Sequence, residues 1–497
     1  MSRLIIGAMI RTLGAYPSGW RAPGAHRDPR GDAAVLRRTA EVAEAARLDY
    51  LFFGDWLATG EDLAYRDPYL LARVDPLSAV TYLAGLTSRI GLIATANTTY
   101  ADPYTLARAT ASADLLSGGR IGLNLVTGSE ARTAGNHGRD ARPSDDSRFD
   151  RAVEFEQVLR TLWDSFEDDA IIADAATGAL LDPSKLHATD FDGRHLNVTG
   201  PLNAVRPVQG HLPIVHSGTS PRSRLFAAQN ADLALVAVSD LEHAIAVREE
   251  LRALAFESGR DDRTLKVIAP VLPIVGETRA HAQSIADELS ELVQIAEDWP
   301  DAPPPAFPAD RSLAQLSSLL GVDVSHRSPD AGVTTAVVAG FSAVGQELVE
   351  IVAERTGRSP SGDRPPTLRH LVVAASVNAS MIVGTAEDIA SEFEAWSDAG
   401  AVDGFNVLAA THPAQFEAFA LGVAPELQRR GLLATEYEGT TLREHLGLAR
   451  PDNVHARAHE VAAHAGSLRP GVRAGGAGGA GGPGGAGRGI EPASWHP

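Results

Sequence analysis

The sequence contains no cysteine among its 497 residues, and this absence excludes several kinds of chemistry. Without thiols the chain forms no disulfide, offers no thiolate nucleophile and builds no zinc–thiolate centre. Basic residues are also scarce, since 44 Lys and Arg stand against 63 Asp and Glu, for a net charge of −19. Proteins that bind nucleic acid or anionic membranes need a basic face, so this balance argues against both.

Long apolar runs are missing as well. No stretch approaches the roughly 20 apolar residues that a membrane-spanning helix requires. The N-terminal stretch MSRLIIGAMIRTLGAYP has an apolar run too short for a signal peptide and lacks a cleavage pattern. Apolar residues still make up 44% of the chain, which is enough for a sizeable core. We therefore expect a cytoplasmic protein that makes no membrane contact and acts on a small molecule.

Short apolar segments alternate with helical patterns along most of the chain. Eight segments predict buried strands, at Leu4–Ile10, Tyr50–Trp56, Ile90–Thr99, Ile121–Thr127, Pro213–Gly218, Leu233–Ser239, Leu265–Val275 and Gly404–Ala410. Helical patterns follow, for example from Asp32, from Pro76 to Leu86 and from Pro103 to Ser117. Apolar strands that each precede a helix are typical of parallel pairing. At this length they favour an α/β fold with a closed (β/α)₈ TIM barrel over an open doubly wound sheet, which stays an alternative.

Two polar segments interrupt this alternation, at residues 167–212 and 296–370. Both predict insertions on barrel loops, the first irregular with room for a hairpin, the second with helices near 311–320 and 341–356. The tail from Arg473 to Gly489 is rich in glycine and has no core-forming residues. We predict one domain over residues 1–450 and a disordered C-terminal extension over residues 451–497.

Several predicted strands become small and polar at their C-terminal ends. These ends carry Asp55 and Trp56, then Thr95, Asn97 and Thr98, then Asn124 and Thr127, then His216 to Ser220. In a parallel barrel the loops at these ends form the ligand site. Taken singly, Asp55 could cap the next segment, and Thr95 or Thr127 could satisfy backbone groups at the rim. Together they predict a binding site at one mouth of the barrel.

The run HSGTSPRSR from His216 to Arg224 ends a predicted strand and begins a helix near Pro221. Glycine permits a close backbone approach, and the free N–H groups of a helix start favour a phosphate. Arg222 and Arg224 would add positive charge. An ordinary helix cap by Ser220 explains this run, taken alone, equally well.

Sequence motifs for other chemistry are lacking. His137, His195, His211 and His216 have no metal-ligand spacing, and no H-E-x-x-H pattern occurs. No phosphate-binding P-loop and no G-x-S-x-G nucleophile elbow occurs either. The sequence therefore gives no support to a metal centre, to NTPase chemistry or to serine-hydrolase chemistry.

Long segments of the chain resemble one family in the same order from about residue 4 to residue 450. They include IGLIATANTTYADPYTLAR, LLSGGRIGLNLVTGSEARTAGNHG, FDRAVEFEQVLRTLWDSFEDDA, GRHLNVTGPLNAVRPVQGHLPIVHSGTS, GTAEDIASEFEAWSDAGAVDGFNVL and PELQRRGLLATEYEGTTLREHLGL. They resemble the bacterial-luciferase-like flavin monooxygenases, in the subgroup that holds nitrilotriacetate monooxygenase component A, dibenzothiophene-sulfone monooxygenase and the pristinamycin synthase subunit. The resemblance implies a TIM barrel that binds FMN at the C-terminal ends of its strands.

The resemblance also implies the reaction. Reduced FMN comes from a separate flavin reductase, O₂ adds to it to give a C4a-peroxide, and this oxygenates a small organic substrate. Carried over by position, Asp55 and Thr95 would lie near the flavin ring, and Thr127 would line the same cavity. Thr219 and Ser220, in place of the family's paired serines, would hold the phosphate. The family also implies a homo-oligomer.

The chain departs from the family at two positions where a histidine and a tyrosine commonly contact FMN. Asp145 and Phe149 stand there, in the segment DDSRFDRAVEF. A carboxylate repels a phosphate and phenylalanine lacks a donor, so each change costs about 1.5–3 kcal/mol of binding free energy. Either FMN binds weakly, or Arg148, Arg222 or Arg224 compensates.

Two other functions stay open from the sequence. A deazaflavin-dependent oxidoreductase shares the same barrel. A non-catalytic flavin-binding protein is compatible with the loss of the histidine and the tyrosine. The substrate cannot be inferred from the sequence, because its determinants lie in the irregular insertions.

Overall fold

The computed structural model describes residues 3–17, 19–59, 72–128, 130–238, 240–298, 311–377 and 380–456. Its centre is a ring of parallel strands, closed by pairing of β10 with β11 and of β1 with β13. In ring order the strands are β1 (Ile5–Met9), β2 (Tyr50–Phe53), β3 (Gly91–Asn97), β4 (Ile121–Val126), β9 (Ile214–Ser217), β10 (Leu233–Leu235), β11 (Lys266–Val275) and β13 (Gly404–Leu408). The predicted (β/α)₈ TIM barrel is confirmed, and the open-sheet alternative is wrong.

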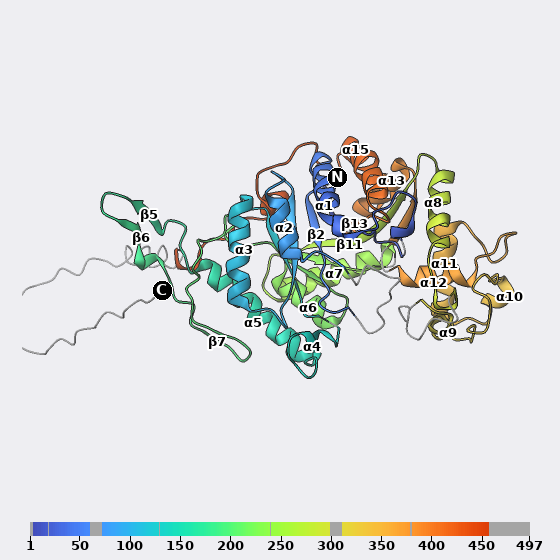
Figure 1. Cartoon of the computed structure of the whole chain (residues 1–497), viewed down its shortest axis with the longest axis horizontal. Coiled ribbons are helices and arrows are strands. Elements are labelled where there is room, and N and C mark those ends of the chain that lie inside the picture. The colour runs from blue at the N-terminus through green and yellow to red at the C-terminus, as the bar shows by residue number, and fades with distance from the viewer. Residues whose placement is uncertain are drawn as a thin grey trace, which may run out of the picture. The chain divides into compact units, whose positions relative to one another are not determined.

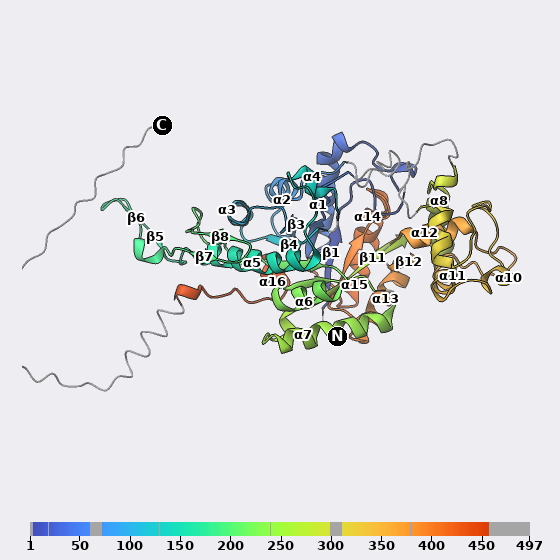
Figure 2. The ribbon, with the colours of Figure 1, turned by 90° about the horizontal axis from the view of Figure 1, so that it is seen from below.

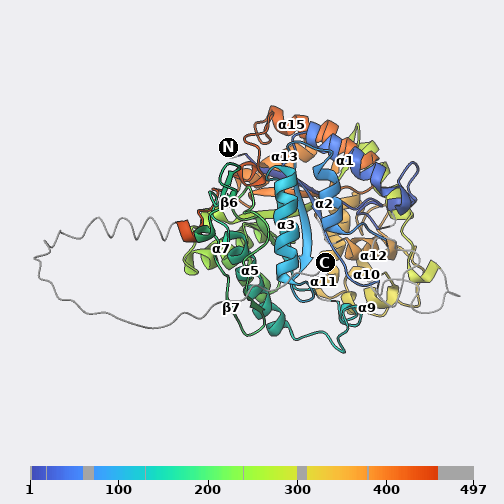
Figure 3. The same cartoon turned by 60° about the vertical axis from the view of Figure 1, so that its left-hand side comes forward.

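Helices cover the outside of the ring. They include α1 (Asp32–Ala45), α2 (Pro76–Ala84), α3 (Pro103–Ser117), α5 (Asp145–Asp164), α6 (Pro221–Asn230), α7 (Leu241–Glu257), α8 (Arg279–Glu291), α13 (Ala386–Asp398), α14 (Ala414–Ala418) and α15 (Ala424–Arg429). Figure 3 shows α1, α2 and α3 side by side, and Figure 2 shows α6 beside α7. Several begin as the sequence predicts, since Asp75 and Asp102 cap α2 and α3 directly before a proline.

The interior of the barrel is a packed core and not a channel. Residues that alternate along the strands, such as Tyr50, Ile93 and Ile268, form an inner apolar cluster with Leu442. Leu442 begins the short helix α16 (Leu442–His445) and is fully buried. A Cβ on Gly91 would lie 2.4 Å from the Leu442 side chain, so a glycine at position 91 makes room for Leu442 inside the barrel.

The two polar segments predicted to be insertions contain secondary structure of their own. The first contains two hairpins, β5 (Ile171–Asp174) with β6 (Ala179–Leu181) and β7 (Phe191–Asp192) with β8 (Asn197–Val198). The second contains α9 (Leu313–Leu320), α10 (Thr335–Val338), α11 (Ala343–Thr356) and α12 (Leu368–Ser376). Helices α9, α11 and α12 pack together around their own apolar cluster (Figure 1).

A ninth strand, β12 (Ser380–Gly384), was not predicted from the sequence. It pairs with the second half of β11, from Val271 with Ser380 to Val275 with Gly384. Two predicted strands end early, because β2 stops at Phe53 and β10 at Leu235, while Ser239 lies outside the described residues.

The chain divides into two units, Met1–Asn453 and Val454–Pro497, and of the second only residues 454–456 are described. The predicted boundary after residue 450 stays a prediction, and the tail from Arg473 to Gly489 lies outside the described residues. In the described part of the chain, no helix is long and apolar enough to cross a membrane.

Candidate functional site

A cavity of about 510 Å³ opens where the C-terminal ends of β2, β3, β4 and β9 meet the first turns of α5 and α6. Five of the six residues predicted to bind the cofactor line it, namely Asp55, Thr127, Phe149, Thr219 and Ser220. The volume lies within the range of about 300–1,000 Å³ that is usual for small-molecule and cofactor sites. The structure thus brings together residues that are up to 165 positions apart, from Asp55 to Ser220.

Thr95, the sixth predicted residue, is not part of the cavity lining. It lies within β3 and is 7% exposed, and its hydroxyl accepts a hydrogen bond from Asn124 Nδ2 at 2.9 Å. Asn97, two residues further along the same strand face, does line the cavity. Thr95 therefore lies two residues deeper in the barrel than Asn97, below the residues that line the cavity.

The start of α6 forms the hydroxyl-rich wall of the cavity. Ser220 caps this helix, because its side chain accepts a hydrogen bond from the Ser223 backbone N–H at 3.2 Å. Thr219 and Ser220 are exposed residues of the cavity lining. The capping interpretation of the HSGTS run is therefore confirmed, and its binding interpretation stays a prediction for a residue that lines the cavity.

The buried His216 stabilises the start of α6 through a hydrogen bond with Ser223. Burial lowers the pKa of His216 to about 4, so the ring is neutral near pH 7. Its Nδ1–H donates to the Leu125 carbonyl at 2.6 Å, and its Nε2 accepts from the Ser223 hydroxyl at 2.7 Å. A Cβ on Gly218 would lie 2.0 Å from Ser223 Oγ, so only glycine fits there. This histidine is a buried structural residue, as its lack of metal-ligand spacing suggested.

Arg148 supplies a guanidinium group to the cavity lining. Its side chain is 4% exposed, and its Nη1 donates to the Thr127 carbonyl at 3.2 Å and to the Thr127 hydroxyl at 3.1 Å. Nη1 also donates to the Gly128 carbonyl, and Nη2 donates to Asp145. The Nε atom has no hydrogen-bond partner among the described residues.

The other two arginines that the sequence offered as compensating charges point elsewhere. Arg222 pairs with Asp150 at 2.6 Å and lies over the Phe149 ring, 5.9 Å from its centroid. Arg224 pairs with Glu250 on α7. Neither is among the described residues that line the cavity.

Carboxylates dominate the charge of the cavity lining. Asp55, Glu130 and Asp145 line it together with Arg148. Asp55 Oδ1 accepts a hydrogen bond from the backbone N–H of its neighbour Trp56 at 2.8 Å. Burial raises the pKa of Asp55, and the nearby Arg73 guanidinium partly opposes this rise. Sequence reasoning missed Ser223 and Glu130, although Ser223 stands at the third position after a predicted cap.

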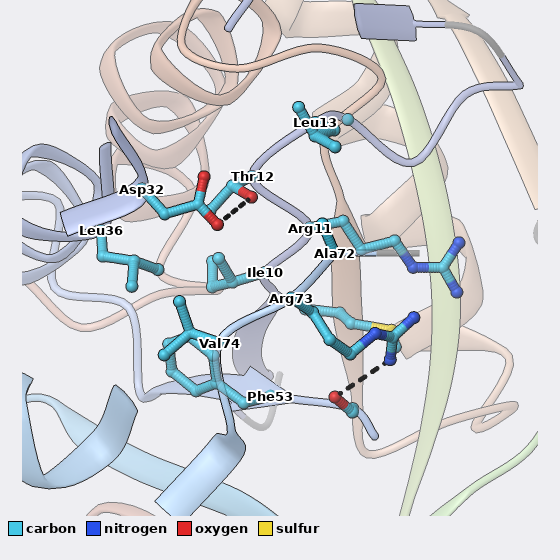
Figure 4. Close-up of a pocket in the computed structure, with 13 residues that line it drawn as sticks. Ile10, Arg11, Thr12, Leu13, Asp32, Leu36, Phe53, Ala72, Arg73 and Val74 are labelled. Carbon is cyan, nitrogen blue, oxygen red and sulfur yellow. Dashed lines mark hydrogen bonds between the residues drawn. The ribbon is translucent and has the colours of Figure 1, made fainter. Parts of the chain in front are cut away.

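A smaller pocket of about 50 Å³ adjoins the ends of β1 and β2 (Figure 4). Its walls are partly apolar, with Ile10 and Leu36, and the Thr12 hydroxyl donates to Asp32 at 3.0 Å. In Figure 4 the side chains of Arg11 and Arg73 extend in the same direction. This pocket and the larger cavity share the end of β2, since Gly54 lines the first and Asp55 the second.

Comparison with known proteins gives the context of this site. The sequence pattern of the luciferase-like monooxygenases matches residues 17–403. The N-acetyl-S-(2-succino)cysteine monooxygenase of Bacillus subtilis (strain 168) is 35% identical over 461 residues, which cover 91% of this chain and 98% of that protein. Nitrilotriacetate monooxygenase component A of Aminobacter aminovorans is 35% identical over 465 residues, with coverages of 91% and 98%. The solved structure of EDTA monooxygenase from Chelativorans superimposes with a TM-score of 0.71 at 28% identity, over 90% of this chain and 99% of that chain.

Proposed function

The chain belongs to the luciferase-like monooxygenase family and is an enzyme of that family, and we propose that it uses reduced FMN and O₂ to oxygenate a small organic substrate. The observation that supports this proposal most is the cavity at the strand ends, whose lining combines hydroxyl groups, a helix start and a buried arginine. The deazaflavin-dependent and the non-catalytic alternatives lose support, because both relatives at 35% identity are monooxygenases.

The residues fit the phosphate end of FMN. The Thr219 and Ser220 hydroxyls offer donors for a dianion near the positive end of the α6 dipole, although Pro221 has no N–H and the Ser223 N–H already donates to Ser220. The neutral His216 orients Ser223 and so keeps this wall in place. Gly218 leaves room for the Ser223 hydroxyl, because a Cβ on Gly218 would lie 2.0 Å from Ser223 Oγ.

The ring of the flavin would lie toward the ends of β2 and β4, where Asp55 and Thr127 line the cavity. Thr127 is oriented by Arg148, and Asp55 by the Trp56 backbone. When bound, reduced flavin would supply the oxygen activation. The protein's share is to bind, to orient and to exclude water.

A separate flavin reductase would supply the reduced cofactor, since the relative nitrilotriacetate monooxygenase component A is named as one component of a larger system. We further propose a carboxylate-bearing substrate. The names of two relatives specify nitrilotriacetate and N-acetyl-S-(2-succino)cysteine, and both compounds carry carboxylates. Arg11 and Arg73, in the pocket beside Asp55, have the planar guanidinium that binds carboxylates.

A reductase-coupled assay tests these proposals. The purified chain is mixed with a flavin reductase, NADH, FMN and air, and oxygenated product is quantified for nitrilotriacetate and for the uncharged dibenzothiophene sulfone. We expect product from the carboxylate compound, and we expect Arg11→Gln to raise its KM. Preferential oxidation of the sulfone would refute the carboxylate proposal alone. No affinity for FMN in either redox state would refute the monooxygenase proposal as a whole.

A further inference from the structure

Arg148 is held against the rim of the barrel through Nη1, one of its two terminal nitrogens. Its Nη1 donates to the carbonyl and the hydroxyl of Thr127 and to the Gly128 carbonyl, at the end of β4. These three acceptors belong to the barrel rim, so they fix the plane of the guanidinium relative to the strands. Only 4% of the Arg148 side chain is exposed, so it has little freedom to turn.

The other edge of the guanidinium is only half used. Nε and Nη2 project from the same edge and together form a fork that suits two oxygens of one anion. Asp145 Oδ1 accepts from Nη2, while Nε has no hydrogen-bond partner among the described residues. A buried donor without an acceptor costs free energy, and an anion with several oxygens would satisfy both positions.

Asp145 is well placed to leave this edge. Its side chain is 69% exposed, at the first residue of α5, and it also lies 3.3 Å from Arg142. Ion pairs of exposed carboxylates are weak, so a dianion can displace this one. Arg148 and Asp145 line the same cavity as Thr219 and Ser220.

We infer that Arg148 binds the cofactor phosphate through its Nε and Nη2 edge, and that Asp145 occupies this edge when no phosphate is present. This inference rests on the proposed FMN binding and goes beyond it, because it assigns a phosphate ligand and an internal competitor to two residues of this chain. It also explains how the carboxylate at position 145 is compatible with an anionic cofactor: the carboxylate turns away to Arg142 or to solvent.

Paired titrations with FMN and riboflavin test the inference, since riboflavin lacks the phosphate. Flavin fluorescence is followed while wild type, Asp145→Asn, Arg148→Lys and the control Asp146→Asn are added. Asp146 is 84% exposed and next in sequence, but it pairs with Arg222 and does not line the cavity. We expect Asp145→Asn to tighten FMN binding about two- to tenfold, because the competing ion pair is lost. Arg148→Lys should weaken FMN binding at least about tenfold, because lysine lacks the fork.

Riboflavin affinity should stay unchanged in Asp145→Asn, and Asp146→Asn should match wild type with both flavins. Arg148→Lys should weaken FMN binding more than riboflavin binding, because Arg148 also orients Thr127 beside the expected place of the flavin ring. An unchanged FMN affinity in Asp145→Asn, or an equal change for FMN and riboflavin, would overturn the inference and leave the proposed function intact. A wild-type chain that binds neither flavin would overturn both. If Arg148→Lys does not fold, the titrations of Asp145→Asn alone test the inference. The Asp145 side chain is exposed and makes no backbone contact that the fold needs, so this variant should fold.

Discussion

Substitution of Phe149 by tyrosine probes the phosphate end of the site most directly. Phe149 is the fifth residue of α5, is 8% exposed and lines the cavity. Its ring contacts His216 edge-on, with centroids 6.3 Å apart, and Phe226 at 6.5 Å. These contacts hold the ring in place, so a hydroxyl added at its tip is positioned by packing that already exists.

The expected gain follows from one charge-assisted hydrogen bond. A hydrogen bond to a charged group contributes about 1.5–3 kcal/mol, and each 1.4 kcal/mol is about a tenfold change in affinity. We therefore expect Phe149→Tyr to tighten FMN binding by about ten- to a hundredfold. If the added oxygen met protein atoms instead, overpacking would cost about 1–3 kcal/mol of stability, and unfolding would reveal it.

The assay is a fluorescence titration of FMN at constant ionic strength, combined with thermal unfolding of the free protein. Phe256→Tyr serves as the matched control, because Phe256 is 74% exposed on α7 and does not line the cavity. A variant that keeps the wild-type melting temperature but binds FMN with unchanged or lower affinity would refute the placement of the phosphate beside Phe149.

Three further predictions concern the support of the site and the barrel. Gly218→Ala should weaken FMN binding at least about tenfold, because the alanine Cβ would lie 2.0 Å from Ser223 Oγ. An unaltered FMN titration would show that the Ser223 side chain moves aside without effect on the site. The folded state lowers the pKa of His216 to about 4, so its neutral form stabilises the fold above about pH 6.5, and this stability is lost as the pH falls toward 4. His216→Gln should flatten that part of the profile of melting temperature against pH, and identical profiles would contradict the assignment. Leu442→Ala should destabilise the fold by about 2–5 kcal/mol in denaturant unfolding, whereas Leu421→Ala, at a side chain 60% exposed, should change it little.

The barrel itself was predictable because its strands are buried on both faces. Segments such as Gly91–Asn97 and Gly404–Leu408 are buried along their whole length, so they read as continuous apolar runs. β12 escaped prediction for the opposite reason, since four of its five residues are only partly buried and it pairs with one half of β11.

The candidate site was predictable as a set of strand ends but not as a set of contacts. Strand direction alone brings Asp55, Thr127 and Ser220 to one mouth, because parallel strands end on the same side. The depth of Thr95 depends on the barrel register, which the sequence does not encode locally. The bond between Arg148 and Thr127 depends on how α5 packs against the end of β4, 21 residues earlier in the chain.

The charge of the cavity lining links these contacts to the proposed use of a diffusing cofactor. A flavin that is reduced on one protein and used on another must bind and leave in each cycle. Thr219 and Ser220 offer neutral donors, and Arg148, the cation of the described lining, already has Asp145 as an anion of its own. Release of the phosphate therefore leaves no uncompensated guanidinium in the wall, because Asp145 can return to it. An exchangeable phosphate site of this kind does not need the histidine and tyrosine of the family, and the carboxylate that replaces the histidine becomes part of the exchange.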